Sequence, residues 1–150
     1  MTMDALARRA EMEIDYNRQM DAQRGQRMSV AVATAHAACT TAADIGAGAI
    51  VTVSKSGATI QFVSQFHPAT PIVACLLEER IRRRMSLYWG VLPLMMPLAS
   101  SSDEMTTLAS QAAERSGAVK RGDLVVITAG VPVGVPGTTN MIRIQRIGDS

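Results

Sequence analysis

The feature that most constrains the fold is a set of short, almost continuous apolar runs, each separated from the next by a helical pattern. Three of these runs, Ala49–Ser54, Pro71–Leu76 and Leu124–Ala129, lack the polar alternation of a half-exposed strand. Strands that are covered on both faces have this composition, which is typical of parallel sheets. Because helical patterns fill the intervals, the sequence predicts an α/β fold, a three-layer α/β/α sandwich.

Two further strands are expected in this sheet. Val91–Met96 is another apolar run, whereas Met141–Ile147 alternates apolar residues with arginine and glutamine. Such alternation marks a strand with one polar face, so we expect Met141–Ile147 to be an edge strand that runs antiparallel to its neighbour. The prediction is a five-stranded, mostly parallel sheet with an antiparallel edge strand.

Five segments carry apolar or small residues at helical spacing: Met1–Gln23, Ser29–Ile45, Ala58–Phe66, Glu78–Trp89 and Ser102–Ser116. The last segment is the clearest helix. Ser101 and Glu104 have the spacing of a capping box before it, and Gly117 supplies its stop.

Composition limits what the chain can do. The 150 residues fit one domain, and the only two cysteines, Cys39 and Cys75, lie among apolar or small residues, so we expect buried free thiols and no metal site. A net charge of +2 gives no reason to expect a nucleic-acid partner. The arginines of Arg80–Arg84 are expected to form a solvated helix face with ion pairs. No signal peptide is visible and the apolar stretch Gly90–Ala99 is too short to span a bilayer, so we expect no membrane partner and a cytoplasmic location.

The apolar run that ends at Ser54 is followed at once by Lys55, Ser56 and Gly57, and then by the helical pattern that contains Thr59. A strand that enters a helix through such a turn leaves backbone N–H groups unpaired, and the helix dipole adds partial positive charge. The hydroxyl groups are further donors and the lysine is a full charge. The turn is therefore a candidate phosphate site, although an alternative stays open in which the serines bind only their own backbone.

A second loop follows the strand Leu124–Ala129, and its end of the sheet is where ligands bind in such folds. Gly130, Gly134 and Gly137 permit close approach of the backbone to a ligand. Further donors follow these glycines, namely Thr138, Thr139 and Asn140. The loop is either a lid over the phosphate turn or a structural crossover between the last two strands, and periodicity does not decide between them.

Six motifs follow one another along the chain: Thr40–Asp44, Ser54–Gly57, Pro71–Ala74, Trp89–Val91, Gly122–Gly130 and Gly134–Asn140. Together, and in this order, they resemble the C-terminal domain of pyruvate kinase, a combination that is far more specific than any one motif. The resemblance implies that residues 28–150 form this domain. It also implies that residues 1–27 are the helical linker from a catalytic barrel that the chain lacks.

The resemblance implies a function for the domain. The whole family enzyme transfers phosphate from phosphoenolpyruvate to ADP, giving pyruvate and ATP in glycolysis. It uses Mg²⁺ and K⁺ on a (β/α)₈ barrel of roughly 250 residues. This chain should therefore hold no catalytic residue, metal or cofactor, and should be inactive alone. It should act as a regulatory and subunit-assembly domain, with its own catalytic domain and further copies as partners.

In regulated members of the family, this domain binds an allosteric effector. The matching phosphate pocket here is Ser54, Lys55, Ser56, Gly57 and Thr59, and the matching lid loop runs from Gly130 to Thr138. Relatives that bind fructose 1,6-bisphosphate add a tryptophan and an arginine that Pro97–Ser101 does not offer. A sugar monophosphate or AMP is therefore the expected effector, and a structural oligomerisation module with a vestigial pocket is the alternative.

One departure from the family concerns the chain segment Leu76-Leu77-Glu78, where relatives carry a polar cap for the following helix. The sequence predicts that this helix lacks a side-chain cap. It also predicts that both leucines lie near the surface.

Overall fold

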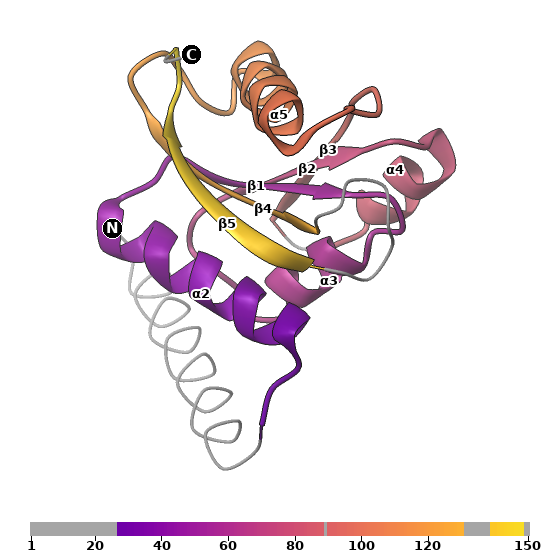
Figure 1. Cartoon of the computed structure of the whole chain (residues 1–150), viewed down its shortest axis with the longest axis vertical. Helices are drawn as coiled ribbons and strands as arrows, with labels where there is room; N and C mark the ends of the chain where they lie inside the picture. Colours follow the sequence, from indigo (N-terminus) through magenta and orange to yellow (C-terminus); the bar gives the residue numbers. More distant parts are fainter. Residues whose placement is uncertain (1–26, 89, 131–138, 149–150) are drawn as a thin grey trace, which may run out of the picture.

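The computed structural model describes residues 27–88, 90–130 and 139–148, and Figure 1 shows their arrangement. The helices are α2 (Val30–Ile45), α3 (Ala58–Ser64), α4 (Glu79–Met85) and α5 (Ser102–Ser116). The strands are β1 (Ala49–Ser54), β2 (Ile72–Leu76), β3 (Val91–Met95), β4 (Leu124–Gly130) and β5 (Thr139–Arg146). The helix expected for Met1–Gln23 lies outside the described residues.

The five strands form one sheet in the order β3-β2-β1-β4-β5. The pairs β1–β2, β1–β4 and β2–β3 are parallel, and only β4–β5 is antiparallel. This confirms the mostly parallel sheet with β5 as its antiparallel edge strand. β3 forms the opposite edge, which is where Pro93 is tolerated because an edge strand can lack one ladder N–H group.

Helices cover both faces of the sheet, as predicted, and give three layers (Figure 1). On one face, Val51, Val73 and Ile127 pack with the small and apolar stripe of α5. On the other face, Ile50 and Ile72 pack with residues of α2 and α3. Leu76 on the same face packs with residues of α3 and α4. The near-continuous apolar runs are explained by this arrangement, since every residue of β1 and of β2 is buried.

The helix ends follow the capping signals. Ser101 Oγ accepts the N–H of Glu104 at 3.1 Å, and Gly117 ends α5 with a left-handed φ of 83°. The Glu104 carboxylate bonds to the N–H of Ser100 at 3.1 Å, so it satisfies a donor one residue earlier than in a standard capping box. The Ser100 hydroxyl also donates to this carboxylate, and the pKa of Glu104 is lowered because the hydroxyl bond first, and then the N–H bond, stabilise the charged form.

Two helices are shorter than predicted. α3 ends at Ser64 and α4 at Met85, because the residues that follow make tighter bonds, such as Phe66 N–H to the Val63 carbonyl and Tyr88 N–H to the Met85 carbonyl. Glu78 makes no side-chain cap for α4, as the sequence predicted.

The expectation that two leucines lie near the surface is wrong for Leu76. Its side chain is fully buried, because it is the last residue of β2 and lies in register between Ser54 of β1 and Met95 of β3. Leu77 is half-buried and packs on the face that α5 covers.

Candidate ligand site at the switch point of the sheet

The strand order reverses between β1 and β4. From β1 the chain moves outward to β2 and β3 on one side, and then crosses to β4 on the other side. Val53 pairs with Ala129 near the carboxyl ends of the two parallel strands, so the Ser54–Thr59 turn and the loop after β4 begin next to each other. In open α/β sheets, ligands bind in the crevice at this reversal. The topology therefore brings together the ends of β1 and β4, from which the two predicted loops start.

Gly57 shapes the turn. Its φ of 89° lies in the left-handed region, and it is the N-cap residue of α3. A Cβ atom built at this position would lie 2.9 Å from Met85 Cε and 3.3 Å from Ile81 Cγ2, both on α4. Glycine is required here for two reasons, its backbone conformation and the close approach of α4.

Both serines of the turn accept hydrogen bonds from local backbone groups. Ser54 Oγ accepts the N–H of Gly57 at 2.9 Å, and Ser56 Oγ accepts the N–H of Ala58 at 3.3 Å. The sequence left open an alternative in which the serines bind their own backbone, and the structure shows this for the amides of Gly57 and Ala58. Accepting a bond leaves the proton of each hydroxyl available for donation, since a hydroxyl is both donor and acceptor.

The remaining donors of the turn differ in exposure. Lys55 is exposed, whereas Thr59 is buried in the first turn of α3. Within the part of the chain that the structure describes, the backbone N–H groups of Thr59 and Ile60 have no hydrogen-bond partner. The turn therefore combines two uncommitted amides, several hydroxyls and one ammonium group, which is a suitable donor set for an oxyanion.

The predicted lid loop is described only at its ends. Gly130 is the last residue of β4 and pairs with Thr139, the first residue of β5, where the strand register shifts. Gly134, Gly137 and Thr138 lie outside the described residues. Thr139 Oγ1 lies 2.5 Å from Thr59 Oγ1, so the start of β5 contacts the Ser54–Thr59 turn directly.

The described residues were also compared with three other possibilities: a reactive cysteine, a metal site and a membrane span. Cys39 and Cys75 are buried, and burial raises the pKa of each thiol to about 12. Residues 27–88, 90–130 and 139–148 contain no cluster of three or more histidine, cysteine or acidic side chains able to hold a metal ion. None of the described helices is both long and apolar enough to cross a membrane.

The arginines of α4 are on the solvated face, as expected. Arg82 forms a two-bond ion pair with Glu79, one bond being 2.7 Å from Nε to Oε2, and Arg83 lies 3.6 Å from the same carboxylate. The Glu79 pKa is lowered, chiefly because Arg82 donates to its charged form.

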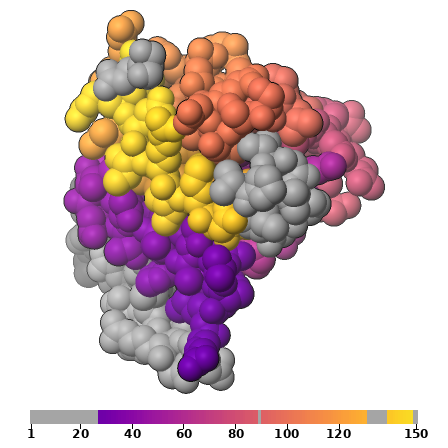
Figure 2. All heavy atoms as spheres, in the orientation of Figure 1, coloured from indigo at the N-terminus to yellow at the C-terminus, as the bar shows by residue number. Residues whose placement is uncertain are grey.

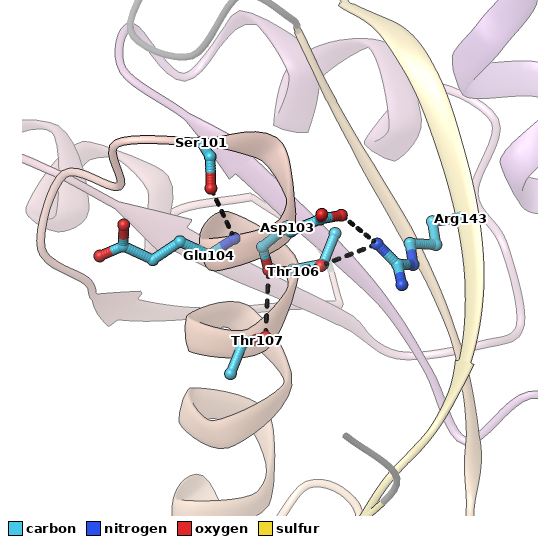
Figure 3. A network of polar contacts seen from close by, with 6 residues as sticks. All are labelled: Ser101, Asp103, Glu104, Thr106, Thr107 and Arg143. Carbon is cyan, nitrogen blue, oxygen red and sulfur yellow. Dashed lines mark hydrogen bonds and ion pairs between the residues drawn. The ribbon is translucent and has the colours of Figure 1, made fainter.

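One network was not predicted from the sequence. Arg143 of β5 donates to Asp103 Oδ1 at 3.1 Å and to Thr106 Oγ1 at 3.3 Å, and so ties the edge strand to the first turn of α5 (Figure 3). The sequence placed Arg143 in the expected edge strand Met141–Ile147. The partner on α5, 40 residues earlier, had no signal in the sequence. The Asp103 side chain is 91% exposed and that of Arg143 is 47% exposed, so solvent screens the pair and its effect on stability is small.

The fold and the site define a class: an open, three-layer α/β/α domain with a donor-rich turn at the reversal point of its sheet. Residues 32–145 match the family described as the pyruvate kinase alpha/beta domain. The pyruvate kinase of Geobacillus stearothermophilus is 41% identical over 150 residues, which are 99% of this chain and 25% of that relative. The pyruvate kinase of Clostridium acetobutylicum is 37% identical over 147 residues, 97% of this chain and 31% of that relative.

The chain therefore belongs to the pyruvate kinase alpha/beta domain family. It spans between a quarter and a third of the length of these two relatives. The family membership agrees with the resemblance of the six sequence motifs and with the observed sheet.

Proposed function

We propose that this chain is the regulatory and subunit-assembly domain of a pyruvate kinase and that it binds a phosphorylated effector at the Ser54–Thr59 turn. The observation that carries the proposal is the meeting of this turn with the start of β5 at the switch point of the sheet. Ser54, Ser56 and the amides of Thr59 and Ile60 would hold the phosphate oxygens, and Lys55 would balance their charge.

The whole enzyme would transfer phosphate from phosphoenolpyruvate to ADP in the cytoplasm. That chemistry would lie in the part of the protein that the relatives have and this chain does not cover, together with its Mg²⁺, K⁺ and nucleotide. Effector binding to this domain would act on catalysis only if it favours one quaternary arrangement over another. The domain is thus proposed to act as a binding partner of its own catalytic domain.

A monophosphate suits the turn better than a bisphosphate. The turn offers one cationic side chain, Lys55, and has alanine at position 58 where many relatives have an arginine or a hydroxyl. The segment Pro97–Ser101 supplies no arginine or tryptophan for a second phosphate. A sugar monophosphate or AMP is therefore preferred over fructose 1,6-bisphosphate.

Calorimetric titration of the 150-residue chain tests the proposal. Ribose 5-phosphate, glucose 6-phosphate, AMP and fructose 1,6-bisphosphate are titrated in turn, with inorganic phosphate as the minimal ligand. Lys55→Glu should abolish binding. Lys120→Glu makes the same charge change on an exposed lysine that precedes β4, at the opposite end of the strand, and should leave binding intact. Absence of binding by every ligand would refute the effector site.

The second candidate is a structural oligomerisation module with a vestigial pocket. The observation that favours it is the open edge of the sheet: β5 runs across the surface between α2 and α5 (Figure 2), and Ile144 on it is 51% exposed. The serine caps on Gly57 and Ala58 are also consistent with a purely structural turn. Light scattering separates the two candidates, because an oligomer unchanged by phosphate ligands and by Lys55→Glu supports the module.

A further inference from the structure

A tight turn leads into β4 and carries two exposed cationic residues, Lys120 and Arg121. The Asp123 N–H donates to the Lys120 carbonyl at 3.0 Å, and Gly122 within the turn has a left-handed φ of 97°. The Gly122 N–H donates to the Ile147 carbonyl at 2.9 Å, which fixes the turn to the end of β5. Figure 1 shows this turn at the end of the molecule that lies away from α3.

Arg146, the last residue of β5, brings a second guanidinium group to this turn. Its Nη1 atom donates at 2.7 Å to the carbonyl of Gly122, the residue that follows Arg121 in the chain. This bond holds the Arg146 side chain at the turn and uses only part of the donor capacity of a guanidinium group. Because a backbone carbonyl has no net charge, the bond does not neutralise Arg146.

The Arg121 side chain is held by its contact with Gly148. A Cβ atom at position 148 would lie 2.7 Å from Arg121 Cγ and 3.0 Å from Arg121 Nε, so the side chain runs directly over this glycine. Gly148 also has a left-handed φ of 98°, which residues with a Cβ atom rarely adopt. The backbone thus fixes the stem of Arg121 close to the turn to which Arg146 is bonded.

These cations have no ion-pair partner within the part of the chain that the structure describes. The ion pairs there involve arginines of α4 and Arg143, and none of them includes Lys120, Arg121 or Arg146. Asp123 is the acid of the turn, and its carboxylate accepts the backbone N–H of Lys120 at 3.0 Å. Three cations beside one carboxylate leave a positive surface, which attracts an external anion.

We infer that Lys120, Arg121 and Arg146 form a binding surface, which we call the cationic tip, for an acidic segment of a protein. A guanidinium group binds a carboxylate through two parallel N–H···O bonds, so two arginines held at one turn suit neighbouring Asp or Glu side chains. The cationic tip lies at the amino end of β4, whereas the Ser54–Thr59 turn lies at the carboxyl end of the parallel strand β1. The inference therefore goes beyond the proposed function and does not depend on it.

The surroundings of the cationic tip favour a protein segment over other anionic partners. Residues 120–122 are all exposed, whereas sites for small ligands are concave. The segments 118–123 and 146–148 contain no aromatic residue on which the bases of a single-stranded nucleic acid could stack. The same segments contain no exposed large apolar side chain that could enter a membrane surface.

Fluorescence anisotropy of a labelled ten-residue glutamate peptide tests the inference on the 150-residue chain. The peptide should bind, and its Kd should rise with salt concentration because exposed charges are screened. Arg121→Glu combined with Arg146→Glu should abolish binding. Arg80→Glu combined with Arg84→Glu is the matched control, because it makes the same change in net charge on exposed arginines of α4 and should leave the Kd nearly unchanged.

Milder variants test the inference even if the charge-reversed chain does not fold, as judged by its thermal unfolding. Arg121→Gln combined with Arg146→Gln should raise the Kd by roughly 2- to 30-fold, the effect of losing two exposed ion pairs. Gly148→Ala should displace the Arg121 side chain and raise the Kd. In the Arg121→Gln background, Gly148→Ala should have no further effect.

Two further probes separate a protein segment from other polyanions: a ten-nucleotide oligothymidylate, and vesicles of phosphatidylcholine and phosphatidylserine in equal parts. In ¹H–¹⁵N NMR spectra, the peptide should shift the amide signals of Arg121 and Gly122 and leave that of Gly57 unchanged. Loss of peptide binding in the variants of the cationic tip alone, together with these shifts, would support the inference.

Several results would overturn the inference and leave the proposed function standing. These are absence of peptide binding, equal losses in the variants of the cationic tip and of α4, and tighter binding of the oligothymidylate or of the vesicles than of the peptide. A peptide that shifts the signal of Gly57 instead of Gly122 would also overturn it, because the anion would then bind at the other end of the sheet.

Discussion

Replacing Gly57 by alanine should destabilise the domain through two separate effects. The left-handed φ of 89° costs an L-residue about 1–2 kcal/mol. The new methyl group would lie 2.9 Å from Met85 Cε and 3.1 Å from Met85 Sδ, and overpacking of a core costs roughly 1–3 kcal/mol. Because methionine is flexible, the contact should lie near the lower end of its range, so we expect a total loss of about 2–4 kcal/mol.

Urea denaturation monitored by circular dichroism measures this loss. With a slope of about 2 kcal/mol/M, in the middle of the typical range, the midpoint should fall by roughly 1–2 M. Gly117→Ala is the matched control, because Gly117 has a φ of 83° but no atom within 4 Å of an added Cβ. It should lose only the conformational term of about 1–2 kcal/mol. Equal midpoints for the two variants would refute the role assigned to the contact between the turn and α4.

Three further predictions concern stability and reactivity. Ser101→Ala should lower the free energy of unfolding by about 1 kcal/mol through loss of the α5 cap, while Ser102→Ala, at an exposed position, should change it little in the same urea assay. His36 has a lowered pKa because burial disfavours its charged form. Protonation of His36 therefore destabilises the folded domain, so the domain keeps its full stability above the usual histidine pKa of about 6.5 and loses stability as the pH falls below it. His36→Gln should therefore reduce the drop in melting temperature between pH 7.5 and pH 5, and an unchanged drop would contradict this cause. Cys39 and Cys75, with pKa values of about 12, should react with a thiol reagent only after denaturation, and rapid modification of the native chain would contradict their burial.

The elements with strong local signals were predicted well. β1 has the predicted bounds of Ala49–Ser54, and α5 has the predicted bounds of Ser102–Ser116. In both cases local sequence signals mark an end of the element. A serine-rich turn follows β1, and α5 lies between its Ser101 cap and Gly117. The length of α4 was overestimated because no sequence signal marks its end at Met85. The residues that follow form tighter turns with i to i−3 hydrogen bonds, such as that from Tyr88 N–H to the Met85 carbonyl.

The site was predictable in its residue types but not in its contacts. The sequence indicated the Ser54–Thr59 turn as a source of donors, since strand, turn and helix follow one another in it. It left open which groups bind their own backbone, and the bonds of Ser54 and Ser56 became visible only in three dimensions. The contact of Thr59 with Thr139 depends on the strand order, which no local pattern specifies.

The central position of β1 has a consequence for how the chain folds. One of its neighbours, β2, follows soon after it, but the other, β4, comes about 75 residues later, as the pairing of Ala49 with Val125 shows. Until β4 arrives, β1 is the open edge of a growing three-stranded sheet, and an unpaired apolar edge promotes aggregation. Closing such a distant pair is slow in comparison with local contacts. Nascent chains that stop before Leu124 should therefore depend most on chaperones.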